Sequence, residues 1–231
     1  MAPCGTIKEF YFPWYIPWLL IIVYSKAMIP FNQLGPVFKA FASLVYPGVF
    51  RKELASIVDR TRQGGSALDI GSGTGILSEF AYRARKDLRY TMIDPAQGML
   101  RFAPRFATKV IGTAENLPFL PGSFDTVFTG DAFHHFKDPD WALQEMRRVM
   151  KDDGVLIVFE IDPGSPLGAI ITWGEKVFGE PAHFYRPQKF LEMLGNHGFE
   201  CRVSRYDWRY SIIARPTGRG GFRLSVTSNR S

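Results

Sequence analysis

The sequence predicts an α/β protein built on a doubly wound, mostly parallel sheet, and three observations support this fold class. A short apolar run, Ala67–Ile70, is followed by glycines at every second position and then by apolar residues at helical spacing. A second apolar run ends in Asp94, and a third, Val155–Phe159, is apolar throughout, as expected of a strand covered on both faces. Strands that alternate with helical patterns in this way indicate βαβ units.

Turn signals and apolar spacing place the remaining elements. Asp138 followed by Pro139 marks the start of a helix, because proline at the first helical position lacks only an N–H that would have no partner in the helix. Residues 26–65 have a helical pattern with breaks at three prolines. Strands are expected at residues 67–71, 88–94, 109–113, 124–130, 155–159, 199–206 and 209–214. Helices are expected at residues 76–86, 96–107, 139–150, 167–178 and 187–196.

The spacing of the glycines bears on the ligand. A dinucleotide-binding loop has the pattern G-x-G-x-x-G and holds a pyrophosphate on the helix N-terminus, whereas Gly71, Gly73 and Gly75 follow the pattern G-x-G-x-G. Asp94 follows Gly71 by 23 residues, close to the offset of about 20 residues for a ribose-binding carboxylate at the end of the second strand. The glycine spacing therefore disfavours a nicotinamide cofactor, while Asp94 favours a ligand that contains ribose.

Four segments, in order, resemble the motifs of the class I S-adenosylmethionine-dependent methyltransferases, and most closely the type 11 subgroup that acts on quinones and other small molecules. The segments are Asp69–Gly75, Ile93–Leu100, Gly112–Phe119, and Ser123–Val127 followed by Ala132–Phe136. This resemblance covers about residues 66–160. It implies a seven-stranded sheet in the order 3-2-1-4-5-7-6 with an N-terminal helical cap, and S-adenosyl-L-methionine as the cofactor.

The resemblance also implies the cofactor contacts. The glycines Gly71, Gly73 and Gly75 would let the methionyl end lie against the backbone, Asp69 would organise the loop and hold the cofactor's ammonium group directly or through water, and Asp94 would bind the ribose. The adenine is expected to meet four residues, namely Met99, Ala114, Glu115 and Leu117. Two alternatives remain: Asp94 as a helix cap, and Glu115 as a solvent-exposed loop acid.

Three polar residues after the fourth expected strand are candidates for the chemistry of the methyl acceptor. Asp131, His134 and His135 follow this strand at the carboxyl edge of the sheet, where open α/β sheets bind their ligands. Either imidazole can act as a base, since histidine titrates near neutral pH. Alternatively, one histidine packs beneath the cofactor and the other caps a loop. No metal site is predicted, because the spacing places no further ligand beside these three residues.

Composition sets the broad class. A chain of 231 residues with 46% apolar residues suits one domain with appendages, and its net charge of +6 is scattered. This charge permits an anionic membrane surface as a partner, but nucleic acid is not expected. The two cysteines, Cys4 and Cys201, stand far apart without a CxxC pattern, which favours the cytoplasmic side of the membrane.

The ends of the chain differ from the middle, so three regions are expected: an N-terminal apolar segment with a helical lid (residues 1–65), the methyltransferase domain (66–216) and a disordered tail (217–231). Residues 10–25 carry no charge, but two prolines leave too short a run for a membrane span of about 20 residues. The segment is interpreted as a lid over the cleft, as a peripheral contact with the inner face of the membrane, or as both.

The sequence thus predicts a methyltransferase that acts on a small, lipophilic acceptor such as a quinone precursor or a lipid. Two alternatives stay open. The first is a methyltransferase of a soluble metabolite, in which the N-terminal segment serves only as a lid. The second is a non-catalytic protein of the same fold that acts in binding or assembly.

Overall fold

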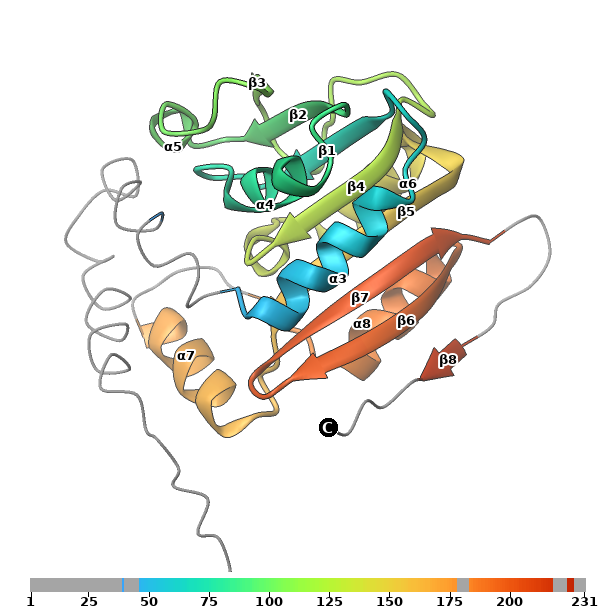
Figure 1. Ribbon diagram of the computed structural model, residues 1–231. Coiled ribbons are helices and arrows are strands. Elements are labelled where there is room, and N and C mark those ends of the chain that lie inside the picture. The colour runs from blue at the N-terminus through green and yellow to red at the C-terminus, as the bar shows by residue number, and fades with distance from the viewer. Residues whose placement is uncertain (1–38, 40–45, 178–182, 218–223, 227–231) are drawn as a thin grey trace, which may run out of the picture.

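The computed structural model describes residues 39, 46–177, 183–217 and 224–226. These residues build one eight-stranded sheet in the order β3-β2-β1-β4-β5-β7-β6-β8 (Figure 1). The first seven strands stand in the predicted order, which is confirmed. The strands are β1 (Ser66–Ile70), β2 (Arg89–Asp94), β3 (Thr108–Ile111), β4 (Phe124–Gly130), β5 (Met150–Ile161), β6 (Phe199–Tyr206), β7 (Arg209–Pro216) and β8 (Leu224–Val226).

The strand directions create one ligand-binding edge. β1 pairs in parallel with both β2 and β4, and β4 pairs in parallel with β5. β7 is antiparallel to β5 and to β6. The strand order reverses between β1 and β4, and at such a reversal an open α/β sheet forms a crevice outside the carboxyl ends of its strands. Every candidate site residue follows the end of one of these parallel strands or lies close to it.

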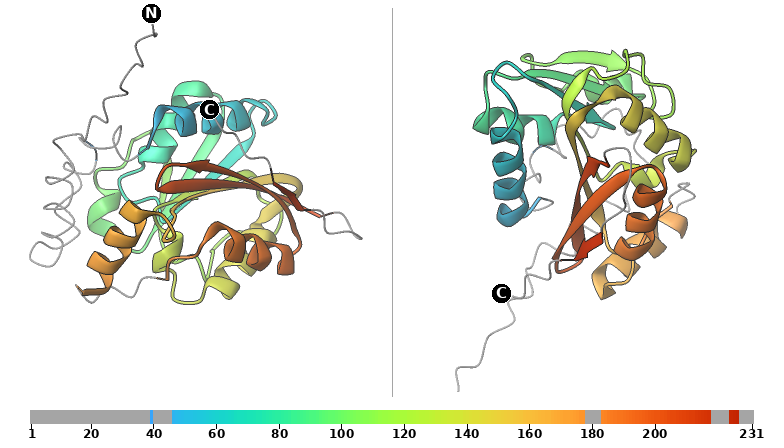
Figure 2. Two further views of the ribbon diagram at one scale, coloured as in Figure 1. Left: turned by 90° about the horizontal axis from the view of Figure 1, so that it is seen from below. Right: turned by 90° about the vertical axis from the view of Figure 1, so that its right-hand side faces the viewer.

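Helices cover both faces of the sheet (Figure 2). On one face, α3 (Gly48–Asp59) packs beside α4 (Ile76–Ala84), and the buried residues there include Phe50, Leu54 and Leu77. On the other face lie α6 (Pro139–Val149) and α8 (Pro187–Asn196), which bury Leu143 and Phe190. Three further elements lie in the connections: α5 (Gln97–Leu100), η2 (Phe133–His135) and α7 (Pro166–Val177).

The structure differs from the predicted elements in three places. The helix expected over residues 96–107 is the single turn α5, because Pro104 cannot donate to a helix and disfavours the helical conformation of the residue before it. β5 begins earlier than expected, with a register shift in its pairing to β4. The range 217–231, expected to be disordered, contributes β8, which pairs in parallel with β6.

The N-terminal predictions concern residues that the structure does not describe. The apolar segment 10–25 and its interpretation as a lid or membrane contact lie outside the described residues. Within the described part of the chain, none of the helices combines the length and the apolar character needed to cross a bilayer.

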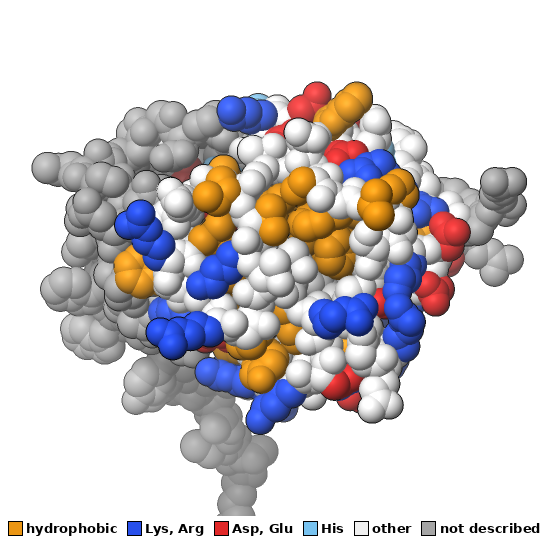
Figure 3. Space-filling view, turned by 90° about the horizontal axis from the view of Figure 1, so that it is seen from above, with side chains coloured by type: hydrophobic (Ala, Val, Ile, Leu, Met, Phe, Trp, Pro, Cys, Tyr) orange, Lys and Arg blue, Asp and Glu red, His pale blue; other side chains and the backbone are white. Residues whose placement is uncertain are grey.

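The outer strand β3 forms one edge of the sheet. Figure 3 shows the molecule from the side of this edge, with apolar side chains gathered between lysines and arginines. Ile111 at the end of β3 and Leu120 in the following loop are both exposed. Lys109, in the middle of β3, donates to the carbonyl of Ala103. Positive charge on an edge strand is a common device against pairing with another chain.

Candidate active site at the carboxyl edge of the sheet

The loop between β1 and α4 folds its backbone donors inward. The N–H groups of Gly71 and Ser72 donate to the Ile93 carbonyl at 2.9 and 3.2 Å, and that of Gly75 donates to the Ser72 carbonyl at 2.8 Å. The N–H of Gly73 donates to Asp94 Oδ2 at 2.8 Å. A phosphate-binding loop needs such donors to face its ligand. Because these four donors are satisfied within the protein, the loop suits a neutral or cationic ligand better than a pyrophosphate.

The three glycines serve different purposes, although each has a positive φ. A Cβ at Gly71 would lie 2.5 Å from Ala132 Cβ, and one at Gly75 would lie 2.7 Å from the Pro104 ring, so both positions are closed by packing. A Cβ at Gly73 would meet only Met99 Cε, at 3.6 Å. The side-chain hydroxyl of Ser72, beside it, is buried and has no hydrogen-bond partner among the described residues. Gly73 and Ser72 thus form the part of the loop with room and hydrogen-bonding capacity for a ligand.

Asp69 is buried and stabilises the start of α4. Its Oδ2 accepts hydrogen bonds from the hydroxyl of Ser78 at 2.7 Å and from the N–H of the same residue at 3.2 Å. Burial raises the pKa of Asp69 to about 7, because the hydrogen bonds from Ser78 only partly offset the desolvation of the carboxylate. These contacts join Asp69 to α4, and its predicted roles in organising the glycine loop and in holding an ammonium group stay predictions.

Asp94 joins the loop after β1 to the loop after β2. Its Oδ2 accepts from the N–H of Gly73, and its Oδ1 accepts from the N–H of Ala96 at 2.7 Å, just before α5. Burial raises the pKa of this carboxyl group, against the effect of these two hydrogen bonds. The carboxylate therefore joins two loops through their backbone N–H groups but does not cap α5, whose N-cap residue is Ala96 and which has no side-chain cap. It keeps further lone pairs for a ribose hydroxyl. Ribose binding stays a prediction.

The four residues expected around the adenine lie in α5 and in the segment that follows β3. Met99 is buried within 4 Å of the position that a Gly73 side chain would take. Ala114 and Leu117 are buried in the apolar cluster that also contains Ile93. Glu115 is half-buried, and its Oε1 accepts from the N–H of Lys137 at 2.7 Å, ahead of α6. An adenine contact by these four residues stays a prediction.

The candidates after β4 sit in a buried polar cluster. His134, in η2, is 3% exposed, and its Nδ1 lies 2.6 Å from Glu160 Oε2. Glu160 Oε1 accepts from the N–H groups of Phe133 and Ala132, so this one carboxylate holds the whole turn. Burial lowers the pKa of His134, but Glu160, Glu175 and Asp131 together raise it above its usual value. His135 is half-buried, and its ring lies 4.0 Å from that of His134.

Asp131 forms an ion pair with a residue of β7. Its Oδ1 accepts from Nη1 of Arg209, which is buried in β7 against the rings of Trp208 and Phe159. Asp131 also has a positive φ of 50°, which is uncommon for a residue other than glycine. Burial raises the pKa of Asp131, while Arg209 lowers it. Neither Arg209 nor Glu160 is recognisable as a site residue from local sequence, because both reach the site from strands distant in the sequence.

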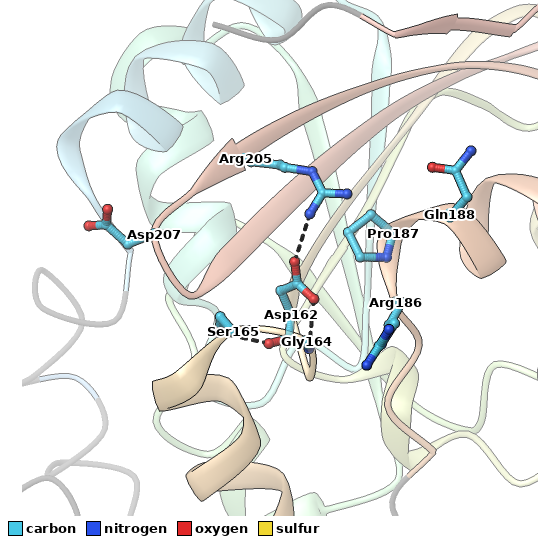
Figure 4. A pocket seen from close by; sticks show the side chains of 8 residues that line it. All are labelled: Asp162, Gly164, Ser165, Arg186, Pro187, Gln188, Arg205 and Asp207. Atoms are coloured by element: carbon cyan, nitrogen blue, oxygen red, sulfur yellow. Dashed lines mark hydrogen bonds and ion pairs between the residues drawn. The ribbon is translucent and has the colours of Figure 1, made fainter. Parts of the chain in front are cut away.

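A polar pocket of about 480 Å³ opens beyond the end of β5 (Figure 4). Asp162 lies at its centre, where Oδ2 accepts from Arg205 Nη1 at 2.9 Å and Oδ1 accepts from the N–H of Gly164. Arg186 and Gln188 line the side formed by the segment before α8 and its first turn. The pocket therefore offers charged groups of both signs.

The sheet order and the site at its switch point define a class I S-adenosylmethionine-dependent methyltransferase, and comparisons with known proteins agree. A family model described as "Methyltransferase domain" matches residues 68–158. The chain is 31% identical to the demethylmenaquinone methyltransferase of Thermotoga maritima over 158 residues, which cover 58% of this chain and 69% of that enzyme. The chain belongs to this methyltransferase family, it is an enzyme, and S-adenosylmethionine is its cofactor.

Two further comparisons extend this result. The chain is 30% identical to the ubiquinone/menaquinone biosynthesis C-methyltransferase of Bordetella avium, over 69% of this chain and 70% of that enzyme. A Haloferax volcanii methyltransferase solved in complex with an activator protein shares the fold, with a TM-score of 0.70 and 15% identity over 82% of this chain and 98% of that one. For two other curated relatives the matched share of their length is only 24% and 57%.

The glycine loop allows a test that separates packing from cofactor binding. Gly71→Ala places a methyl group against Ala132 at a strained φ and is expected to lower the free energy of unfolding by about 3 kcal/mol. Gly73→Ala is expected to lower the free energy of unfolding only by the backbone strain of a positive φ, about 1–2 kcal/mol. Its methyl group would, however, fill the open part of the loop. We therefore expect a loss of S-adenosylmethionine affinity of about tenfold or more for Gly73→Ala, measured by calorimetry on protein whose stability is followed by urea unfolding. Full affinity in Gly73→Ala would contradict this assignment of the loop.

Proposed function

We propose that this methyltransferase acts on a small lipophilic ring acceptor of the quinone-precursor class. The observation that supports this most directly is the similarity over about two thirds of their length to relatives named demethylmenaquinone and ubiquinone/menaquinone methyltransferases. The aromatic side chains around η2 add to it. Phe184 stacks on the His134 ring at 4.2 Å, and Tyr185 lies edge-on to Phe133. Such a surface suits a flat apolar ring.

In the proposed reaction the protein mainly positions two reactants. The cofactor, when bound, supplies an electrophilic methyl group on a sulfonium. Its adenosyl and methionyl parts would be held by Ser72, Gly73 and Asp94. Asp69 would stabilise the start of α4 through Ser78. In-line positioning of an acceptor against a methyl group contributes about 7–11 kcal/mol to catalysis in well-oriented systems.

The acceptor's proton needs a base if the nucleophile is a phenol oxygen or an acidic ring carbon. We propose His134 or His135 for this role, because Glu160 orients the first ring and the second is half-buried at the same turn. Asp131, paired with Arg209, would instead fix the backbone that leads into η2.

A soluble, charged metabolite is the second candidate acceptor, and the pocket around Asp162 favours it. Arg186 and Arg205 would face a carboxylate or phosphate there, while an apolar ring would gain little from them (Figure 4).

A peripheral membrane contact belongs to the proposal for the lipophilic acceptor. Residues 10–25 would provide it, and α7 adds two exposed apolar side chains, Ile170 (49% exposed) and Trp173 (62%). Tryptophan favours the headgroup zone of a bilayer. Flotation with anionic vesicles tests this contact: the full chain should float, and both deletion of residues 1–25 and Trp173→Ala should reduce the floating fraction.

The acceptor class is tested with labelled cofactor. Purified protein is incubated with S-adenosylmethionine carrying a labelled methyl group and with either a short-chain demethylated naphthoquinol or a panel of soluble amines, carboxylates and phosphates. We expect a naphthoquinol product that gains one methyl group by mass spectrometry. Methylation of a soluble acceptor alone would refute the lipophilic class, and its loss in Arg205→Ala would assign the Asp162 pocket as its site. Saturable cofactor binding without any product would leave both proposed acceptor classes unsupported.

A further inference from the structure

Three side chains at the acceptor end of the site form a cluster with the donor set of a transition-metal site. His134 and His135 in η2 and Glu175 in α7 each offer a nitrogen or oxygen atom, and these atoms all lie within 4.8 Å of one another. We propose that His134, His135 and Glu175 bind one divalent transition-metal ion. The spacing in the sequence did not place Glu175, which reaches the cluster from an element 40 residues further along the chain.

The geometry of His134 is that of a metal-binding histidine. Its Nδ1 is occupied by the contact with Glu160 Oε2 at 2.6 Å, so Nε2 is the ring nitrogen that faces Glu175 Oε2, at 3.7 Å. A carboxylate on the second ring nitrogen fixes the tautomer and increases the basicity of the ligating nitrogen. Glu160 is itself held by two backbone N–H groups, so this arrangement exists before any ion binds.

The two buried carboxylates of the cluster favour a bound cation. Glu160 and Glu175 are 3% and 6% exposed, and both lie against the same imidazole. Arg209, a buried cation nearby, is paired with Asp131. Two buried carboxylates beside one imidazole are costly to keep charged, and a positive charge between them lowers that cost. A metal ion would supply such a charge, and a second proton on His134 is the alternative that the measurements below distinguish from it.

The position of α7 and the identity of the donors define the class of ion. Glu175 follows Ile171 and Thr172 on the buried side of α7, whereas Ile170 and Trp173 face outward. Ligand atoms around a tetrahedral zinc ion lie about 3.4 Å apart, so small side-chain rotations bring this set to bonding distance. Two imidazoles and one carboxylate suit Zn²⁺, Fe²⁺ or Co²⁺ better than Ca²⁺ or Mg²⁺. The half-buried side of His135 leaves room for water as a further ligand.

The site changes the roles proposed above for the two imidazoles. With an ion bound, their nitrogens are ligands, and an acceptor hydroxyl on the metal would lose its proton to water more readily than in solution. Binding of the ion does not depend on the identity of the acceptor, so it is measured without any acceptor present.

The experiment titrates chelator-treated full-length protein with Zn²⁺ and with Co²⁺. We expect one ion per chain by calorimetry and elemental analysis, a rise in the melting temperature, and a visible Co²⁺ spectrum of a four- or five-coordinate site. Glu175→Gln and His135→Gln should each weaken binding by about 100-fold, and Glu160→Gln by about 10–100-fold. His197→Gln, in the turn after α8, is the matched control and should bind as the wild type does.

Absence of binding at micromolar ion concentrations, or binding that Glu175→Gln and His135→Gln do not change, would overturn the proposal. In that case nitrogen NMR should show His134 doubly protonated between the two carboxylates. Retained S-adenosylmethionine affinity in each variant shows that the protein is folded. Because metal binding is measured without an acceptor, its failure is distinguishable from failure of the proposed acceptor class.

Discussion

Replacing Asp94 with alanine is expected to weaken binding of S-adenosylmethionine and S-adenosylhomocysteine by at least about tenfold. The carboxylate accepts the N–H groups of Gly73 and Ala96, one from each of the loops that would enclose the cofactor. Its removal leaves two donors without partners, at a cost of about 1–3 kcal/mol each where they are buried. It also removes the group proposed to hold the ribose. Calorimetric titration of both ligands measures the change.

Two further variants make this result specific. Asp94→Asn keeps one oxygen acceptor for the loops and is expected to retain more of the stability than of the affinity. Asp152→Ala removes an exposed carboxylate of β5 and is expected to leave both unchanged. If Asp94→Ala bound either ligand with wild-type affinity, neither the ribose role nor the role of Asp94 in forming the loop would stand.

Replacing Asp69 with asparagine is expected to stabilise the protein at pH 8 while it weakens cofactor binding. Burial raises the pKa of Asp69 to about 7, far above its value of about 3.9 in an unfolded chain. The ionised form is therefore disfavoured in the folded state. At pH 8 this costs on the order of 2–4 kcal/mol. Asparagine carries no charge, and its amide oxygen can still accept from Ser78.

The free energy of unfolding of the wild type is expected to fall, relative to that of Asp69→Asn, as the pH rises. An acid whose pKa is raised by folding binds more protons in the folded state, so its contribution to stability falls as pH rises. The penalty is absent below pH 4, grows between about pH 4 and 7, and is complete above pH 7. Urea unfolding at several pH values should show Asp69→Asn more stable than the wild type at pH 8 and equal to it near pH 4. A pH-independent difference would contradict the assigned cause.

The local parts of the site were predictable because they rest on neighbours in the sequence. The glycine pattern, the acid at the end of β2 and the cap at Asp138 each act within one turn, and the structure has them in these places. The length of α5 was overestimated because apolar spacing outweighed the effect of Pro104. The position of Asp94 in the sequence predicts a ligand contact, whereas the structure shows that its carboxylate joins two loops.

The parts that sequence reasoning missed depend on contacts between distant segments. Glu160 ends an apolar strand, and an acid there signals a site only once β5 is known to lie next to β4. Arg209 in β7 reaches Asp131, which follows β4, past the intervening strand β5, and the position of Glu175 depends on the path of α7. No local pattern encodes these pairings. The acceptor end was therefore predictable in its location but not in its chemistry.

The inward-facing donors of the glycine loop have a consequence for selectivity. Nucleoside triphosphates and dinucleotides share the adenosine part of S-adenosylmethionine and compete for any pocket that recognises adenosine alone. Here a phosphate would find the N–H groups of Gly71, Ser72, Gly73 and Gly75 already engaged within the protein. The backbone of one tight turn thereby disfavours anionic competitors without the need for a repelling side chain.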